Sequence, residues 1–189
     1  MTASFILSDG RSVKIRALDA ADTDALRRAL ARADTDDLRR RFMGSPPPTR
    51  MLVELLRVAD GVHDAALGAF TEAGRLVAVA QFDRRDDRPS AEIAIEVAKD
   101  FQHCGLGSEL AWRIGRLAYD RGIRTFTVNY LAENEAVSKL VRRGAAASGP
   151  TIESGSARAE IDLVVAFEGT DDEDGDQAAG RATARPEQS

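Results

Sequence analysis

The chain has 189 residues, 43% of them apolar and 30% charged, so it can form one domain with a sizeable core but hardly two. Its formal net charge of −5 lies in the last residues: positions 168–189 hold seven acids and two arginines, which leaves 24 acids and 24 bases in residues 1–167. A neutral body argues against DNA or RNA as the main partner, because nucleic acids bind a basic face.

The sequence also lacks the marks of export, membrane insertion and metal binding. The N-terminus has no basic and apolar signal pattern, and no stretch approaches the roughly 18–20 apolar residues that cross a bilayer. The single cysteine cannot form an internal disulfide. Two histidines and one cysteine give no metal-ligand pattern, so no metal is expected. These observations predict a cytoplasmic protein with no membrane partner.

The first third of the chain predicts a β-hairpin followed by helices. An Asp9-Gly10 turn joins two apolar runs, which is typical of a hairpin. Leu26 and Leu30 recur at helical spacing, and either Asp19 or Asp22 can cap that helix. The expected elements are strands at 5–7 and 13–16 and helices at 22–33, 34–41 and 51–58.

The rest of the chain alternates strands with helices. The clearest strand alternates with period two: Ile93, Ile95 and Val97 form an apolar face, and Glu92 and Glu96 lie on the other. The expected elements are strands at 65–70, 76–82 and 91–97, a helix at 107–121, a strand at 123–130, a helix at 134–143 and a strand at 159–167.

This order predicts an α/β (α+β) domain over residues 1–167, with a mixed, mostly antiparallel central sheet flanked by helices. The helix between Val97 and Ile123 makes a parallel crossover. Residues 168–189 form an acidic tail with little to bury and are expected to be disordered. Trp112 is expected in the core or in an interface, and the sequence leaves the oligomeric state, a homodimer included, undecided.

The segment from Val97 to Ser108 carries the chemistry. A strand leads into a short loop with Gly105 and Gly107, and the loop opens a helix whose first backbone N–H groups have no partner within the helix. With the helix dipole behind them, such amides bind a diphosphate, and Ser108 can add a hydroxyl. A glycine-rich connection without a ligand is the alternative. A P-loop is excluded because no Gly-Lys-Ser/Thr follows, and the third glycine of a dinucleotide fold is missing.

The run Gln102-His103-Cys104-Gly105-Leu106-Gly107 resembles the (Arg/Gln)-x-x-Gly-x-(Gly/Ala) acyl-CoA loop of GNAT N-acetyltransferases, and the resemblance extends over residues 13–145. The stretch 134–140 resembles the second cofactor segment of that family. The resemblance implies a GNAT-like sheet that is splayed in the middle to hold acyl-CoA, with acetyl-CoA as cosubstrate. The implied cofactor-binding residues are Val97, Gln102, His103, Cys104, Gly105, Leu106, Gly107, Ser108 and Asn134. Asn134 can equally be the N-cap of the following helix.

A narrower likeness concerns the acceptor. The stretch 38–42, Asp60 with His63, and Ala91-Glu92 are similar to Pat-type bacterial protein lysine acetyltransferases. That likeness implies direct transfer of an acetyl group to a primary amine, with a protein lysine side chain favoured. A small amine, such as a polyamine or aminoglycoside, is the alternative acceptor. A catalytically inactive acyl-CoA-binding regulator and a nicotinamide-binding domain are the alternative functions.

The candidate general bases are Glu92 and Glu96. An alkylamine with a pKa of about 10.4 is almost wholly protonated at pH 7, so transfer needs a group that removes its proton. Glu92, ten residues before Gln102, matches the position of the base in the lysine acetyltransferases of this fold and is preferred. A solvated strand face is the alternative for both. Val141 occupies the place where many GNAT enzymes carry a tyrosine that protonates the leaving thiolate, and this departure favours the regulator.

Overall fold

The structure of the protein is a computed structural model that describes residues 2–32, 64–84, 88–143 and 149–168. The helices expected at 34–41 and 51–58, and the Pat-like residues at 38–42, 60 and 63, lie outside the described residues.

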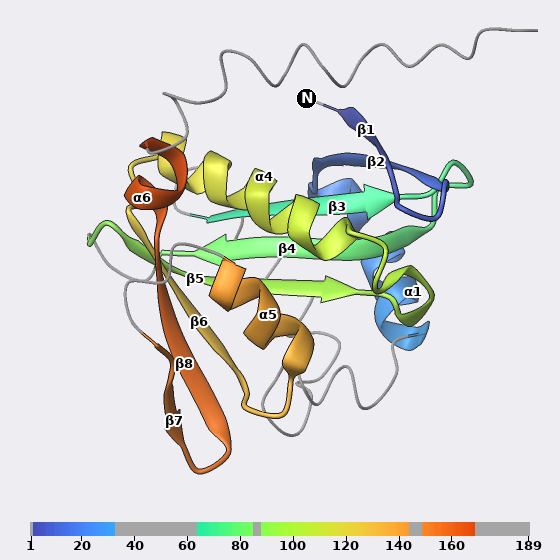
Figure 1. Cartoon of the computed structure of the whole chain (residues 1–189). Helices are drawn as coiled ribbons and strands as arrows, with labels where there is room; N and C mark the ends of the chain where they lie inside the picture. Colours follow the sequence, from blue (N-terminus) through green and yellow to red (C-terminus); the bar gives the residue numbers. More distant parts are fainter. Residues whose placement is uncertain (1, 33–63, 85–87, 144–148, 169–189) are drawn as a thin grey trace, which may run out of the picture.

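The core of the protein is one eight-stranded sheet with the order β1-β2-β3-β4-β5-β6-β8-β7 (Figure 1). Every neighbouring pair is antiparallel except β5 and β6, which run parallel. The predicted fold class, a mixed and mostly antiparallel sheet with helices, is therefore confirmed. The strands are β1 (Ala3–Ile6), β2 (Ser12–Ala17), β3 (Asp64–Phe70), β4 (Leu76–Asp83), β5 (Ser90–Val97), β6 (Thr125–Leu131), β7 (Thr151–Glu153) and β8 (Ser156–Asp162).

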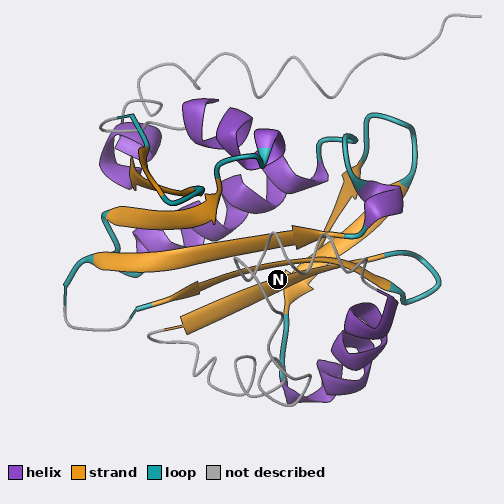
Figure 2. Ribbon diagram, turned by 90° about the horizontal axis from the view of Figure 1, so that it is seen from below, coloured by secondary structure: helices purple, strands orange, loops and turns teal. Residues whose placement is uncertain are grey.

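The helices of the described residues cover both faces of this sheet. They are α1 (Thr23–Arg32), α4 (Leu106–Asp120), α5 (Glu135–Arg143) and α6 (Leu163–Glu168), with short 3₁₀ turns η1 (Ala20–Asp22) and η2 (Lys99–Phe101). Figure 2 shows α1 on one face and the other three helices on the opposite face. The sheet therefore separates two apolar layers, a large one under α4 and a smaller one under α1.

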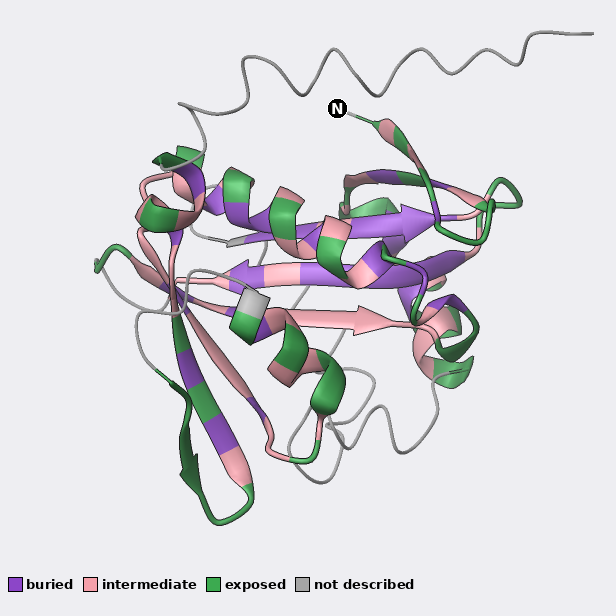
Figure 3. Cartoon of the chain, viewed as in Figure 1, coloured by how far each residue is buried: buried purple, intermediate pink, exposed green. Residues whose placement is uncertain are grey.

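Helical and strand periodicity explain the large layer. Leu106, Leu110, Ile114 and Ala118 recur every four residues and form the buried stripe of α4 (Figure 3). The odd-numbered residues of β5, from Ala91 to Val97, pack against that stripe. Cross-strand neighbours share a face of a sheet, so Glu92 and Glu96 lie on the α1 face, as the alternation predicts.

The C-terminal element differs from the prediction. The expected strand at 159–167 ends at Asp162, and the following residues form α6 instead. The Asp162 carboxylate accepts hydrogen bonds from the backbone N–H groups of Val164 (2.8 Å) and Val165 (3.2 Å), which starts a helix at this point. The helix extends to Glu168, whose carboxylate accepts a hydrogen bond from the Tyr119 hydroxyl. Strand β7 was not predicted.

Trp112 does not lie in the core. It is 60% exposed on the outer face of α4, with its ring edge-on to Phe167 of α6.

Candidate active site

The loop between β5 and α4 is held in place by local hydrogen bonds and by one from the turn after β1. The Gln102 side-chain amide donates a hydrogen bond to the Val97 carbonyl (3.0 Å), which ties the loop to the end of β5. The Cys104 carbonyl accepts from the Ser8 N–H (3.1 Å), and its buried thiol donates to the Phe101 carbonyl (2.8 Å). Leu106 anchors the start of α4 in the core. The loop is therefore a fixed part of the fold.

The same loop presents a row of backbone donors. His103 (φ 58°) and Gly105 (φ 88°) have left-handed backbone conformations, and a Cβ built on Gly105 would meet no atom within 4 Å. Within the described part of the chain, no acceptor pairs with the backbone N–H groups from Gly105 to Ser108. These amides stand at the positive end of the four-turn helix α4, and together they suit an anionic group.

A gap in the sheet opens toward this loop. The parallel ladder between β5 and β6 joins Ser90–Glu92 to Thr125–Thr127 and goes no further, although β5 continues to Val97. From there on β6 pairs only with β8 among the described strands. Figure 1 shows the two strands diverging from this point.

The backbone of β5 points into that gap. The Ala98 N–H donates to the carbonyl of Val77 in β4 (2.8 Å), so Ala98 and Val77 are a hydrogen-bonded pair of the β4–β5 ladder. Bonded and non-bonded pairs alternate in an antiparallel ladder, so Ile95 and Val97 direct their N–H and C=O groups away from β4, toward β6. Gln102 takes the Val97 carbonyl, and the other groups form an edge that an extended ligand can pair with.

The two candidate carboxylates occupy different positions on the α1 face. Glu92 lies where the β5–β6 ladder ends, and its Oε1 accepts a hydrogen bond from the Asn129 side chain of β6 (3.1 Å). Glu96, about 13 Å further along the strand at 3.3 Å per residue, lines a cavity. The sequence predicted the shared face but not the Asn129 contact, because 37 residues separate the two partners.

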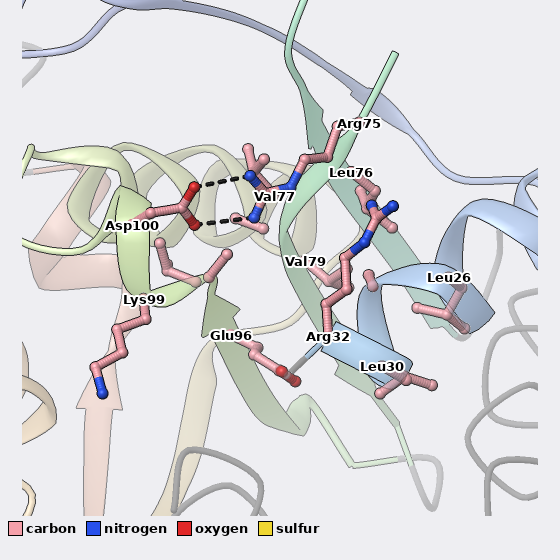
Figure 4. A pocket seen from close by; sticks show the side chains of 14 residues that line it. Leu26, Leu30, Arg32, Arg75, Leu76, Val77, Val79, Glu96, Lys99 and Asp100 are labelled. Carbon is pink, nitrogen blue, oxygen red and sulfur yellow. Dashed lines mark hydrogen bonds and ion pairs between the residues drawn. The ribbon is translucent and has the colours of Figure 1, made fainter. Parts of the chain in front are cut away.

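The cavity has a volume of about 220 Å³ and lies between α1, β4, the end of β5 and η2 (Figure 4). Asp100, on its rim, forms a bidentate ion pair with Arg75 at 2.7 and 2.9 Å. The hydrogen bonds from Arg75 lower the pKa of the Asp100 carboxyl, which keeps that group ionised. The sequence indicated an apolar face on α1 but not this cavity. The lining residues are Leu26, Ala29, Leu30, Arg32, Arg75, Leu76, Val77, Ala78, Val79, Glu96, Val97, Ala98, Lys99 and Asp100.

Asn134 is the residue before α5, and its Oδ1 accepts a hydrogen bond from the Val137 N–H (3.2 Å). This is the helix-capping role that the sequence offered as one alternative. Because β5 and β6 are parallel, Asn134 and the Gln102 loop both follow the carboxyl ends of their strands and flank the gap between them. The expected contact of Asn134 with a cofactor stays a prediction.

Two features are absent from the described residues. No group of three His, Cys, Asp or Glu side chains there is arranged to hold a metal ion. In the same part of the chain, no helix combines the length and apolarity that a membrane span requires.

Comparisons with known proteins agree on one family. A model of the acetyltransferase (GNAT) family matches residues 29–145. The GNAT domain of S. lividans PAT is 25% identical, with a TM-score of 0.77, and the match covers 85% of this chain and 96% of that one. A variant of a cAMP-binding acyltransferase from Mycobacterium smegmatis is also 25% identical (TM-score 0.62), and here the match covers 86% of this chain but only 48% of that protein. At 18% identity, yncA of Salmonella typhimurium, a putative acetyltransferase solved with its cofactor acetyl-CoA, shares the fold (TM-score 0.64; 80% and 94% covered).

Proposed function

This chain belongs to the acetyltransferase (GNAT) family, and we propose that it transfers an acetyl group from acetyl-CoA directly to a primary amine, a protein lysine side chain in particular, with Glu92 as general base. Membership makes it an acyltransferase of a family that uses acetyl-CoA. The observation that carries the finer proposal is the gap between β5 and β6, which opens beside the amides of Gly105–Ser108, for which no described residue provides an acceptor.

The residues around the gap fit an acyl-CoA. The amides of the loop from His103 to Ser108 would hold the diphosphate, and the side of Gly105 is open to it. Ile95 and Val97 would pair with the amide groups of the pantetheine arm, as in strand addition, and Asn134 borders the same gap. When bound, acetyl-CoA supplies the thioester whose acyl carbon the amine attacks.

Glu92 is proposed to take the proton of the amine. Deprotonating an alkylammonium at pH 7 costs about 4.6 kcal/mol, because its pKa lies some 3.4 units higher. A positioned carboxylate typically contributes about 10²–10⁴ in rate. The hydrogen bond from Asn129 orients the Glu92 carboxylate at the closed end of the gap, where the two strands separate, and this supports its assignment.

Val141 supplies no acid at the place of the usual tyrosine. Its side chain is buried in the cluster that joins α5 to Tyr130 of β6. A thiol has a pKa of about 8.5, so a thiolate can depart without a dedicated acid at modest cost. The single cysteine, Cys104, is buried and unpaired, which fits the proposed cytoplasmic location.

The proposal is tested with Glu92→Gln, Glu96→Gln and, as a control, Glu153→Gln. Glu153 is an exposed glutamate of β7, the last strand in the order of the sheet. Release of free thiol from acetyl-CoA is measured with a panel of lysine peptides and small amines, and acetyl-CoA affinity is measured by thermal shift. We expect Glu92→Gln to lower turnover roughly 10²-fold or more with unchanged affinity, and the control to match the wild type.

Two other outcomes would change the assignment. If Glu92→Gln kept full turnover while Glu96→Gln lost it, the role of base would pass to Glu96. Acetyl-CoA binding without turnover on any amine would favour the alternative of an acyl-CoA-binding regulator.

A further inference from the structure

The face of the sheet that carries Glu92 holds a row of acidic side chains. Glu92 has Asp83 of β4 as its cross-strand partner on one side and Thr127 of β6 on the other. Thr127 in turn pairs with Glu160 of β8. Cross-strand partners share a face, and neighbouring strands are about 4.8 Å apart, so the backbones at Glu92 and Glu160 are about 10 Å apart. Within this row, only the short side chain of Thr127 separates the two glutamates.

Glu160 is exposed and can meet a ligand. Buried and exposed residues alternate along β8 (Figure 3), with Ala157 and Ala159 in the apolar cluster beneath α5 and Glu160 on the opposite face. Within the ranges that the structure describes, no side chain forms an ion pair or a hydrogen bond with Glu160 or Asp83. Both carboxylates can therefore interact with a bound cation.

The charge of this region is negative. The row contributes three carboxylates, and Arg158, two residues before Glu160 on the same face, contributes one cation that forms no ion pair with it, so the formal charge of the four groups is −2. Asp83 and Glu92 lie directly opposite each other, and like charges in that arrangement destabilise a sheet. A cationic ligand on this face offsets that cost.

The row lies beside the reaction site of the proposed mechanism. The β5–β6 ladder stops after Glu92 and Thr127, so the row borders the closed end of the gap. One ammonium at Glu92 changes the formal charge of the region from −2 to −1, and a second positive group is still attracted. An extended peptide advances about 3.3 Å per residue, so a basic side chain within about three residues of the acceptor lysine can reach Glu160.

The openness of this face favours a protein segment over a small amine. Small ligands are usually bound in concave sites that bury most of their surface. Glu160 instead stands on an exposed strand face, and the row extends from β4 to β8 across the sheet. Such a surface suits a chain that lies across several strands.

We propose that Glu160 is a specificity-determining residue of the acceptor site, and that it selects a protein lysine with a basic residue close to it in the sequence. The inference rests on the proposed acetyl transfer and names its substrate class. The acceptor amine is bound at Glu92, which remains the base, and the neighbouring basic side chain is bound at Glu160 across Thr127.

The test compares three acceptors under initial-rate conditions: a short peptide with one lysine between arginines, the same peptide with glutamates in place of the arginines, and spermidine. Arginine supplies positive charge without an acetylatable amine. We expect kcat/KM for the arginine-flanked peptide to exceed that for the glutamate-flanked peptide by about tenfold, with the difference in KM. Raising the salt concentration should reduce this ratio toward one, because exposed charges are screened.

Substitutions on β8 identify the residue. Glu160→Gln should lower the ratio several-fold by raising KM for the arginine-flanked peptide, with kcat unchanged, and Glu160→Lys should lower it further. Arg158→Gln should raise the ratio, since it removes the opposing charge from the same face. A general disturbance of β8 would not change the ratio in opposite directions at two positions. The matched control is Glu153→Gln, on exposed β7, which should keep the wild-type ratio.

Equal kcat/KM values for the two peptides, a higher kcat/KM for spermidine than for either peptide, or the same ratio in Glu160→Gln and Glu153→Gln would each overturn this inference. Those results would leave amine acetylation itself standing. A failure to acetylate any amine would instead overturn the proposed function, and the specificity with it.

Discussion

At the scale of single residues, the Asp22 carboxylate holds the turn η1 that leads into α1. It is 7% exposed, and its carboxylate accepts two hydrogen bonds from the Arg16 guanidinium, each 2.6 Å long. It also accepts the Asp19 N–H (3.1 Å), which completes a capping box at η1. Arg16 in turn lies 4.2 Å above the ring of Phe70. One carboxylate thus joins β2, η1 and the apolar layer beneath α1.

The stability of the protein should depend on the ionisation of this carboxylate. The hydrogen bonds from Arg16 hold the pKa of Asp22 below its usual value of 3.8. A lowered pKa stabilises the fold above the usual value, and this contribution is lost as the pH falls through the lowered one. We expect Asp22→Asn to lower the free energy of unfolding by about 1–3 kcal/mol at pH 7 and by less near pH 3.

Urea unfolding at the two pH values measures this difference. Asp24→Asn is the control. Among the described residues Asp24 makes only an exposed contact of 3.5 Å with Arg27, so this substitution should change stability by about 0.5 kcal/mol or less. If Asp22→Asn lowered the free energy of unfolding equally at pH 7 and pH 3, ionisation of Asp22 would be excluded as the cause.

Several single residues of the site could be predicted because their signals are local. A cap lies next to its helix, and the Gly105 turn and the alternation of Glu92 and Glu96 are patterns of a few residues. No local sequence pattern indicates the contact between Asn129 and Glu92, because it forms only when the two strands come together in the sheet. The link between Gln102 and Val97 spans five residues, but the direction of a side chain in a loop does not follow from periodicity.

At the scale of elements, α6 closes the core under α4. Phe167 is 5% exposed, and its ring lies 3.2 Å from the point where a Cβ on Gly115 would be. The absence of a side chain at Gly115 is therefore what lets α6 approach α4 so closely.

Phe167→Ala should be strongly destabilising, since it empties a closely packed space. We expect a loss of about 3–4 kcal/mol, against about 1 kcal/mol or less for Trp112→Ala, whose ring is mostly exposed although it touches Phe167. Chemical denaturation of both variants gives the comparison. Equal losses would mean that the two aromatic rings contribute alike and that α6 does not close the core.

The same element shows where sequence patterns fail. The residues Leu163–Phe167 are a short apolar run, and periodicity alone does not separate a buried strand from a helix in such a run. Asp162 before this run caps the helix, a role that was not assigned to it from the sequence. Strand β7 has three residues, too few for a pattern, and exists through its pairing with β8. Longer elements with full periods, such as α4 and β5, were predicted to within two residues.

At the scale of the whole molecule, the site lies at the one parallel junction among the described strands. A parallel pair needs a crossover, and here α4 provides it. The crossover necessarily places the start of its helix beyond the carboxyl end of β5, where the sheet opens. The connection that makes β5 and β6 parallel therefore also brings the backbone amides of Gly105–Ser108 to the gap. Element order predicted this arrangement, but the point of divergence after Glu92 is visible only in the ladder.

The position where the folded unit ends can be tested by truncating the chain. The sequence predicted a domain over 1–167, and we propose that its end is Glu168, where α6 ends and Tyr119 reaches the carboxylate. A chain cut after Glu168 loses six acids and two arginines, so its formal charge changes from −5 to −1. Because this truncation removes none of the contacts described for α6, we expect the melting temperature of the shortened chain to stay within about 1 °C of the full chain and its acetyl-CoA affinity to be unchanged.

A cut after Asp162 should instead destabilise the protein at least as much as Phe167→Ala, since it removes Leu163 as well as Phe167 from the core. Thermal unfolding with and without acetyl-CoA distinguishes the two truncations, and a large loss in the first would mean that residues 169–189 belong to the folded unit.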